Sequence, residues 1–239
     1  MARQQGLESL DLLPPFADFL LDGLLTPRIA QLRMRYAPAD RITARLEELE
    51  KKELIELAGG AYRSTDKLSP LLKAMRSAVA DVASKLWEAN EVEISVLTEA
   101  ARLIRETVSP DQVVAAAHTK VREPLDRYSL LEHRLVTLRY MRQHDHAMAW
   151  IDRDLTATEA AAVTALWQGE EAELSDEVAE NLRENGLLKK SDPYALTSKG
   201  KKTRESIEED TNERSEKSFA ALDEDAASRF IEALKAMPG

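Results

Sequence analysis

The sequence predicts a mainly α-helical protein in which two winged-helix modules, each with a small β-hairpin as its wing, are arranged in tandem and joined by a long helical region. The first observation is composition. Ala, Leu, Glu, Arg and Lys dominate, while the chain holds only 8 Gly and 9 Pro, which favours long helices. The second is an internal repeat of one short pattern, and the third is the order of elements around each copy of it.

The repeat consists of residues 46–68, "LEELEKKELIELAGGAYRSTDKL", and residues 182–200, "LRENGLLKKSDPYALTSKG". In each copy a helical apolar pattern ends, a turn with Gly, Asp or Pro follows, and a Thr or Ser then caps another helix. Three pairs of residues match between the copies: Tyr62 with Tyr194, Thr65 with Thr197, and Lys67 with Lys199. The repeat therefore predicts an internal duplication of one small module.

The N-terminal module has three predicted helices before its wing, over residues 13–25, 26–36 and 38–54. Thr26 can cap the second of them, with Pro27 in its first turn. The third has apolar residues on one face, namely Ile42, Leu46 and Leu49. After the wing, a helix runs to about residue 88. Helix, helix, helix, hairpin and helix is the order of a winged helix.

The second module is shorter. A helix over residues 156–169 is followed by residues 170–186, which leave room for one helix before the wing, so a degenerate helix-turn-helix is expected. Between the modules, residues 90–151 are helical in pattern. A terminal helix over residues 221–237 is expected to turn Phe230, Ile231 and Leu234 inward, and all three tryptophans are expected in the core. The predicted division is a winged-helix module (1–90), a central helical region (91–152) and a degenerate winged-helix module with the C-terminal helix (153–239).

Composition also limits the function. The chain has no cysteine, so disulfides, thiol nucleophiles and cysteine metal sites are excluded. No apolar run reaches the length of a membrane span, and residues 1–16 lack a signal-peptide core, so a cytoplasmic protein with no membrane partner is expected. The net charge of −10 means that nucleic-acid binding needs a local basic face.

The C-terminal 130 residues resemble the SalK-like helix-turn-helix family of actinobacteria and, more loosely, MarR-type winged-helix regulators. The segments that carry the resemblance are "SPDQVVAAA" (109–117), "LRYMRQHDHAMAW" (138–150), "LTATEAAAVTALW" (155–167), "LRENGLL" (182–188) and "LTSKGKKTRESIEEDTNE" (196–213). The resemblance implies two winged-helix-like modules in one chain, as if a MarR-type dimer had been fused. It implies little chemistry.

DNA binding by the N-terminal module is the first functional hypothesis. In a winged helix the third helix enters the major groove and the wing contacts the backbone or the minor groove. The candidate contacts around that helix and on the wing are Arg35, Arg41, Thr43, Arg45, Arg63 and Lys67. The later turns of the helix are acidic, as a solvated face would be. The second module carries seven acidic residues and one Arg between Glu170 and Glu184, so its helix would repel phosphate. One competent face per chain favours a homodimer on palindromic duplex DNA.

The histidines suggest a second type of site. His144 and His146 are two residues apart, about 200° around a helix, so they cannot both hold one metal ion from a regular helix. Packed polar groups are the plainer interpretation. The alternative is a pocket for a small-molecule effector, lined by Tyr140, His144, His146 and Trp150. No metal site and no cofactor are predicted.

Nothing in the sequence indicates catalysis, because there is no Gly-rich phosphate loop and no nucleophile elbow, so no enzyme is predicted. Two hypotheses remain. One is a MarR-like DNA-binding transcriptional regulator that reads DNA through its N-terminal module. The other is a winged-helix scaffold that does not read DNA and binds a small molecule or a partner protein through its central helices. The first predicts one contiguous basic surface, and the second predicts that carboxylates interrupt it. The arginines concerned are Arg28, Arg33, Arg35, Arg41, Arg45 and Arg63.

Overall fold

A computed structural model describes residues 13–191 and 193–238. The chain forms two compact units, and each is considered by itself. Unit 1 comprises the chain up to residue 141 together with residues 218–239, and unit 2 comprises residues 142–217. The predicted division at residues 90 and 152 remains a prediction. The stretch judged for a signal peptide falls mostly on residues 1–12, outside the described part.

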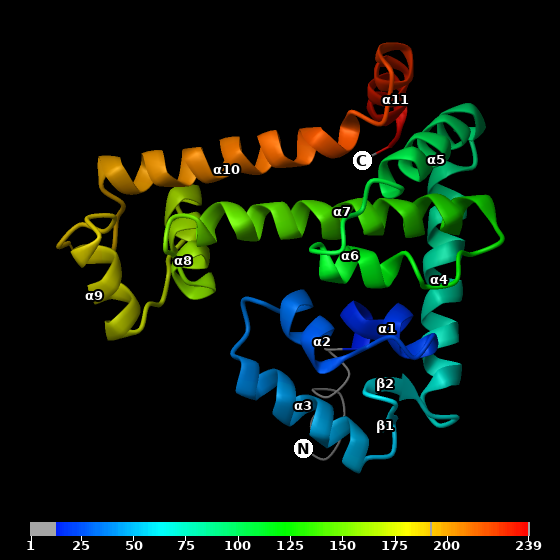
Figure 1. Ribbon diagram of the computed structural model, residues 1–239, viewed down its shortest axis with the longest axis horizontal. Coiled ribbons are helices and arrows are strands. Elements are labelled where there is room, and N and C mark those ends of the chain that lie inside the picture. The colour runs from blue at the N-terminus through cyan, green and yellow to red at the C-terminus, as the bar shows by residue number, and fades with distance from the viewer. Residues whose placement is uncertain (1–12, 192, 239) are drawn as a thin grey trace. The chain divides into compact units, whose positions relative to one another are not determined.

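Unit 1 contains most of the helices and the one two-stranded sheet that the described residues form (Figure 1). Its elements, in chain order, are α1 (Leu13–Leu21), α2 (Pro27–Arg33), α3 (Ala39–Lys51), β1 (Ile55–Ala58), β2 (Ala61–Ser64), α4 (Ser69–Trp87), α5 (Glu91–Arg105), α6 (Val113–His118), the first part of α7 (Arg127–Ile151) and α11 (Glu224–Ala236).

The first elements of unit 1 have the order of a winged helix. Leu25, between α1 and α2, forms a β-bridge with Tyr62 of β2, so the hairpin gains a third, one-residue strand. Strands β1 and β2 pair antiparallel, with Ala58 opposite Ala61. Gly59 and Gly60 make the two-residue turn between them, and both have positive φ, 61° and 84°, as a type I′ turn requires. The expected N-terminal helices and wing are therefore present.

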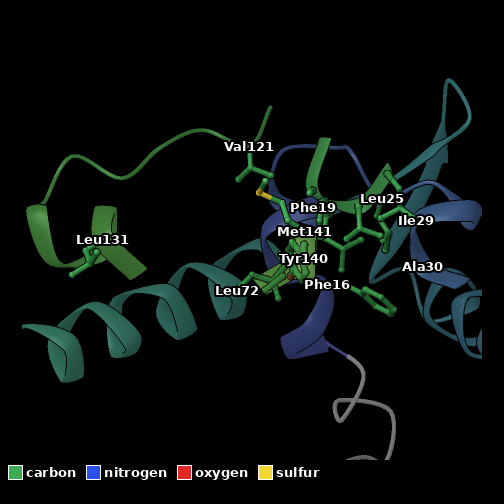
Figure 2. Close-up of a cluster of buried hydrophobic side chains, with 14 of the residues drawn as sticks. Phe16, Phe19, Leu25, Ile29, Ala30, Leu72, Val121, Leu131, Tyr140 and Met141 are labelled. Carbon is green, nitrogen blue, oxygen red and sulfur yellow. The ribbon is translucent and has the colours of Figure 1, made fainter. Parts of the chain in front are cut away.

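The core of unit 1 takes buried side chains from all of its helices and from both strands, and Figure 2 shows the part around α1, α2 and α7. Phe16, Phe19 and Leu25 are fully buried there, and Tyr140 of α7 is 6% exposed. The start of α2 is fixed by Thr26, whose hydroxyl accepts the amide N–H of Ile29 at 3.1 Å. Helix α3 follows α2 as the second helix of the helix-turn-helix.

Unit 2 contains the end of α7, α8 (Ala157–Gln168), α9 (Asp176–Glu184) and α10 (Ser198–Phe219) up to residue 217. Its core includes Trp150, Val163, Leu182 and Ile207. Between residues 170 and 186 the chain forms one helix, α9, as the sequence predicts. The wing of this unit is reduced to an isolated β-bridge between Leu188 and Leu196.

The helix-to-wing junctions of the two units share a set of hydrogen bonds. In unit 1 the Thr65 hydroxyl donates to the carbonyl of Glu53 at 2.7 Å, and the Thr65 amide donates to that of Leu54 at 3.1 Å. In unit 2 the Thr197 hydroxyl donates to Gly186 at 2.7 Å, and the amide donates to Leu187 at 2.9 Å.

The matched lysines agree as well. Lys67 Nζ donates to the carbonyl of Lys52 at 2.9 Å, and Lys199 Nζ to that of Asn185 at 2.8 Å. The matched Thr and Lys residues therefore make equivalent hydrogen bonds in the two units. This similarity supports a gene duplication, which remains a prediction.

Three core assignments were wrong. Ile231 and Leu234 of α11 are 50% and 44% exposed, because Phe230 and Ala233 form the buried stripe of that helix. Trp167 is 46% exposed at the end of α8, with the guanidinium of Arg204 over its ring at 5.4 Å. Among the described residues, no helix is long and apolar enough to cross a membrane.

Candidate nucleic-acid interface and a buried histidine cluster

Helix α3 packs through one apolar face, and most of its other residues are exposed to solvent. Ile42, Leu46 and Leu49 recur at i, i+4 and i+7 and are at most 3% exposed. Pro38 precedes the helix, and Glu53 follows its end with a positive φ of 58°. The packing anchors α3 against the unit 1 core.

The N-terminal half of α3 carries two of the predicted contacts on its exposed side. Arg41 is exposed and makes no hydrogen bond or ion pair with any residue that the structure describes. The same holds for Arg28 in the first turn of α2. Thr43 is exposed, and its hydroxyl donates to the carbonyl of Ala39 at 3.0 Å. Arg28, Arg41 and Thr43 are therefore available to a partner.

Two other predicted contacts are paired with carboxylates. Arg45 Nη1 lies 2.9 Å from Glu48 Oε2, and Arg63 Nε lies 2.6 Å from Glu56 Oε1 across the wing. Arg33 is turned inward, with its guanidinium over the ring of Tyr140 at 5.0 Å. The six arginines considered above therefore do not form one uninterrupted basic surface.

Arg35 and Lys67 are held mainly by backbone carbonyls. Arg35 Nε donates to the carbonyl of Leu32 at 3.1 Å, and burial lowers the pKa of its guanidinium below the ordinary value. Lys67 makes the junction bond to Lys52 and lies 3.7 Å from Glu53 Oε2. Both side chains have structural partners already.

The charge of the two wing-bearing segments differs in sign. Residues 26–68 hold nine basic and seven acidic residues, a net charge of +2 in a chain of −10. Residues 156–200 hold four basic and nine acidic residues, a net charge of −5. Phosphate backbones attract the first segment and repel the second.

The four residues suggested as an effector pocket belong to different compact units. Tyr140 lies in unit 1, packed edge-on against His118 with ring centroids 5.1 Å apart. In unit 2, His146 Nδ1 is 3.1 Å from the Thr211 hydroxyl, and Trp150 is 7% exposed. His144 is half-buried. Their grouping into one pocket remains a prediction.

A cluster that the sequence did not indicate lies inside unit 1. Asp18 of α1, His118 of α6 and His133 of α7 bring one carboxylate oxygen and two imidazole nitrogens within 4.8 Å of one another. The two imidazole rings stack, with centroids 4.4 Å apart. His118 is fully buried and His133 is 3% exposed.

The environment shifts the titration of two members of this cluster. Burial, followed by the neighbouring His118, lowers the pKa of His133 to about 4, because the charged imidazolium would lose its hydration. Burial alone would raise the pKa of Asp18. The His118 ring and the guanidinium of Arg76, which donates to Asp18 at 2.6 Å, outweigh burial and hold it at about 2.

Comparison with known protein families gives a match to a helix-turn-helix family over residues 37–238. The chain belongs to this helix-turn-helix family. The match includes α3, the wing and the whole of unit 2, and begins after α2. Neither the comparison with curated proteins nor that with solved structures gives a match.

Membership of a helix-turn-helix family agrees with the predicted class and indicates a regulatory rather than an enzymatic protein. The finer resemblance to SalK-like and MarR-type proteins stays a prediction. The buried cluster was missed because its members come from three different helices and Asp18 is about a hundred residues from the two histidines. One sequence signal could have indicated that His118 is buried. It follows the apolar Val114 and Ala115 by four and three residues, and this spacing places it on the inner face of α6.

Proposed function

We propose that the chain is a DNA-binding transcriptional regulator and that it contacts DNA through α2, α3 and the wing of unit 1. The observation that carries the proposal is Arg41, an exposed cation without a partner among the described residues, in the first turn of the second helix of a helix-turn-helix. Family membership supports the same assignment.

The arrangement of charge along α3 suits entry by its N-terminal end. In helix-turn-helix proteins the N-terminal residues of the recognition helix contact base edges, and the preceding helix contacts the backbone. Arg41 and Thr43 lie in the first half of α3, and Arg28 lies in the first turn of α2. The acidic residues Glu47 and Glu50 lie in the second half, away from the groove in this orientation. Arg41 can bind guanine or phosphate in a bidentate manner.

A single competent module predicts a dimer. The second module has a net charge of −5 between residues 156 and 200 and a wing of one β-bridge. By net charge it attracts phosphate less than the first module does. Two copies of the chain would then be needed to read both halves of a palindrome.

A second candidate function is favoured by the ion pairs on the same face. Because Glu48 and Glu56 neutralise Arg45 and Arg63, a winged-helix scaffold that binds a partner protein or a small molecule, and not DNA, remains the competing hypothesis. It predicts no DNA retention at any salt concentration.

The regulator and the scaffold hypotheses can be distinguished by fluorescence anisotropy with a labelled random DNA duplex, measured from about 20 to 200 mM salt. The regulator predicts binding that weakens steeply with salt. Arg28→Glu with Arg41→Glu should weaken binding at least tenfold and reduce the slope of log K against log salt by about 2, since each lost phosphate contact contributes about 0.9.

The matched control is Lys201→Glu with Lys202→Glu, which makes the same change in net charge on exposed positions of unit 2. A small loss of affinity in the control and a large loss in the unit 1 variant support the proposal. Equal losses in the two variants would assign the binding to net charge alone, and absence of binding by the wild type would support the scaffold.

A further inference from the structure

The buried cluster of Asp18, His118 and His133 contains two orphaned nitrogens. The Nε2 atoms of His118 and His133 are both buried, and neither has a hydrogen-bond partner among the described residues. Buried polar nitrogens without a partner are rare, because the group loses water and gains nothing in return. Both histidines belong to the cluster that includes Asp18.

A neighbouring hydroxyl fixes the orientation of the His118 ring. Nδ1 of His118 lies 2.8 Å from the Thr137 hydroxyl, and that hydroxyl donates to the carbonyl of His133 at 3.4 Å. In the tautomer with the proton on Nδ1, the Thr137 oxygen accepts from Nδ1–H of His118, and the lone pair is on Nε2, which faces the Asp18 carboxylate. The other tautomer turns Nε2–H toward Asp18, and metal binding selects the first.

A guanidinium fixes the orientation of Asp18. Arg76 Nε donates to Asp18 Oδ1 at 2.6 Å, and the other oxygen, Oδ2, lies 3.8 Å from His118 Nε2. Two lone-pair atoms thus face each other at a distance too long for a hydrogen bond. Metal ligands in proteins are oriented in this way by outer hydrogen bonds, here from the imidazole Nδ1–H to Thr137 and from Arg76 to the carboxylate.

We propose that unit 1 binds a divalent transition-metal ion of the zinc class through Asp18 Oδ2, His118 Nε2 and His133 Nε2. Ligands about 2.1 Å from a tetrahedral ion are about 3.4 Å from one another. The separation of 3.8 Å between His118 and Asp18 needs to close by about 0.4 Å, and the widest separation in the set, within 4.8 Å, by at most about 1.4 Å. Rotation of the three side chains has to supply these movements when the ion binds.

The ligand set selects the class of metal. Two imidazoles and one carboxylate suit Zn²⁺, Co²⁺ or Ni²⁺, whereas Ca²⁺ and Mg²⁺ prefer sites made of oxygen atoms alone. Three protein ligands leave a fourth position for water. The site links α1, α6 and α7, so ion binding would join three helices of the winged-helix unit. The competing interpretation is an internal ion pair, in which a protonated His118 faces Asp18 and no metal binds.

Titration of untagged, chelator-treated full-length protein with Co²⁺ tests the proposal, because cobalt bound by imidazole gives visible ligand-field bands. We expect one ion per chain and, in a thermal melt with Zn²⁺ at about a hundred times its Kd, a rise in Tm of roughly 5–10 °C. His118→Gln and His133→Gln should each weaken binding more than tenfold. His146→Gln, which removes an imidazole from unit 2, should bind like the wild type.

X-ray absorption of the zinc-loaded wild type supplies a readout that does not depend on how the variants fold. Scattering from two imidazoles supports the site. An ion surrounded by oxygens alone, retention of the cobalt bands in both glutamine variants, or no binding by the wild type would overturn it and leave the internal ion pair. None of these outcomes depends on whether the protein binds DNA.

Discussion

Replacing Gly200 with alanine tests how closely α10 is packed against the wing of unit 2. An alanine Cβ would lie 2.3 Å from the carbonyl oxygen of Leu187 and 3.2 Å from Leu196 Cδ2. A carbon and an oxygen in contact are separated by about 3.3 Å, so α10 and the chain at Leu187 must move apart by about 1 Å. The same oxygen accepts the Thr197 amide at 2.9 Å, and that bond would weaken.

Two losses and one gain determine how the substitution changes the free energy of unfolding. Overpacking costs about 1–3 kcal/mol, the upper end applying here because the obstacle is backbone, and the weakened hydrogen bond costs about 1 kcal/mol. Alanine gains about 1 kcal/mol over glycine in helix propensity. We expect Gly200→Ala to lower the free energy of unfolding by about 2–3 kcal/mol.

Urea unfolding followed by tryptophan fluorescence in a Trp87→Phe background measures this change, because Trp150 and Trp167 then report on unit 2. Ser198→Ala, an exposed position in the same turn, is the control and should change stability by less than about 0.5 kcal/mol. If Gly200→Ala were as stable as the wild type or more stable, helix propensity would dominate and the close approach would be refuted.

The remaining predictions concern ion pairs and the junctions. Glu123→Gln should cost about 2–3 kcal/mol at pH 7, since it leaves Arg134 and Arg105 without their carboxylate. The hydrogen bond from Arg134 outweighs burial and lowers the pKa of Glu123. The stability that the Glu123 carboxylate contributes is therefore fully present above the unfolded pKa of about 4.3 and is lost as pH falls through the folded pKa. The difference in free energy of unfolding between Glu123→Gln and the wild type, measured by urea melts, should shrink over that range, and a difference independent of pH would contradict this. Thr65→Val and Thr197→Val should each cost about 1 kcal/mol, measured by the same melts, whereas a loss in only one of them would show that the junctions are not equivalent.

Local chemistry made the elements around the wing predictable. Thr26 next to Pro27 marks the start of α2, and Gly59–Gly60 between two short apolar runs marks a hairpin. The matched Thr residues bond to backbone carbonyls 12 and 11 residues earlier in the two copies, and the matched Lys residues to carbonyls 15 and 14 residues earlier. Such signals depend on sequence spacing alone.

The candidate site was predictable only in part. The sequence gives the position of Arg41 on α3, but not that Arg63 pairs with Glu56, because that pairing depends on the register of two strands. The face that α11 buries likewise depends on its tertiary neighbour α5, so Ile231 could not be placed from periodicity. The Asp18 cluster needs the packing of three distant helices, which no spacing encodes.

Hydrogen–deuterium exchange of the full chain with and without duplex DNA tests the central claim most directly, because it locates the binding surface. We predict slower exchange at the starts of α2 and α3 and around Gly59–Gly60, with residues 185–202 unchanged. Slower exchange in residues 185–202 alone, or no change anywhere at low salt, would contradict DNA recognition by unit 1.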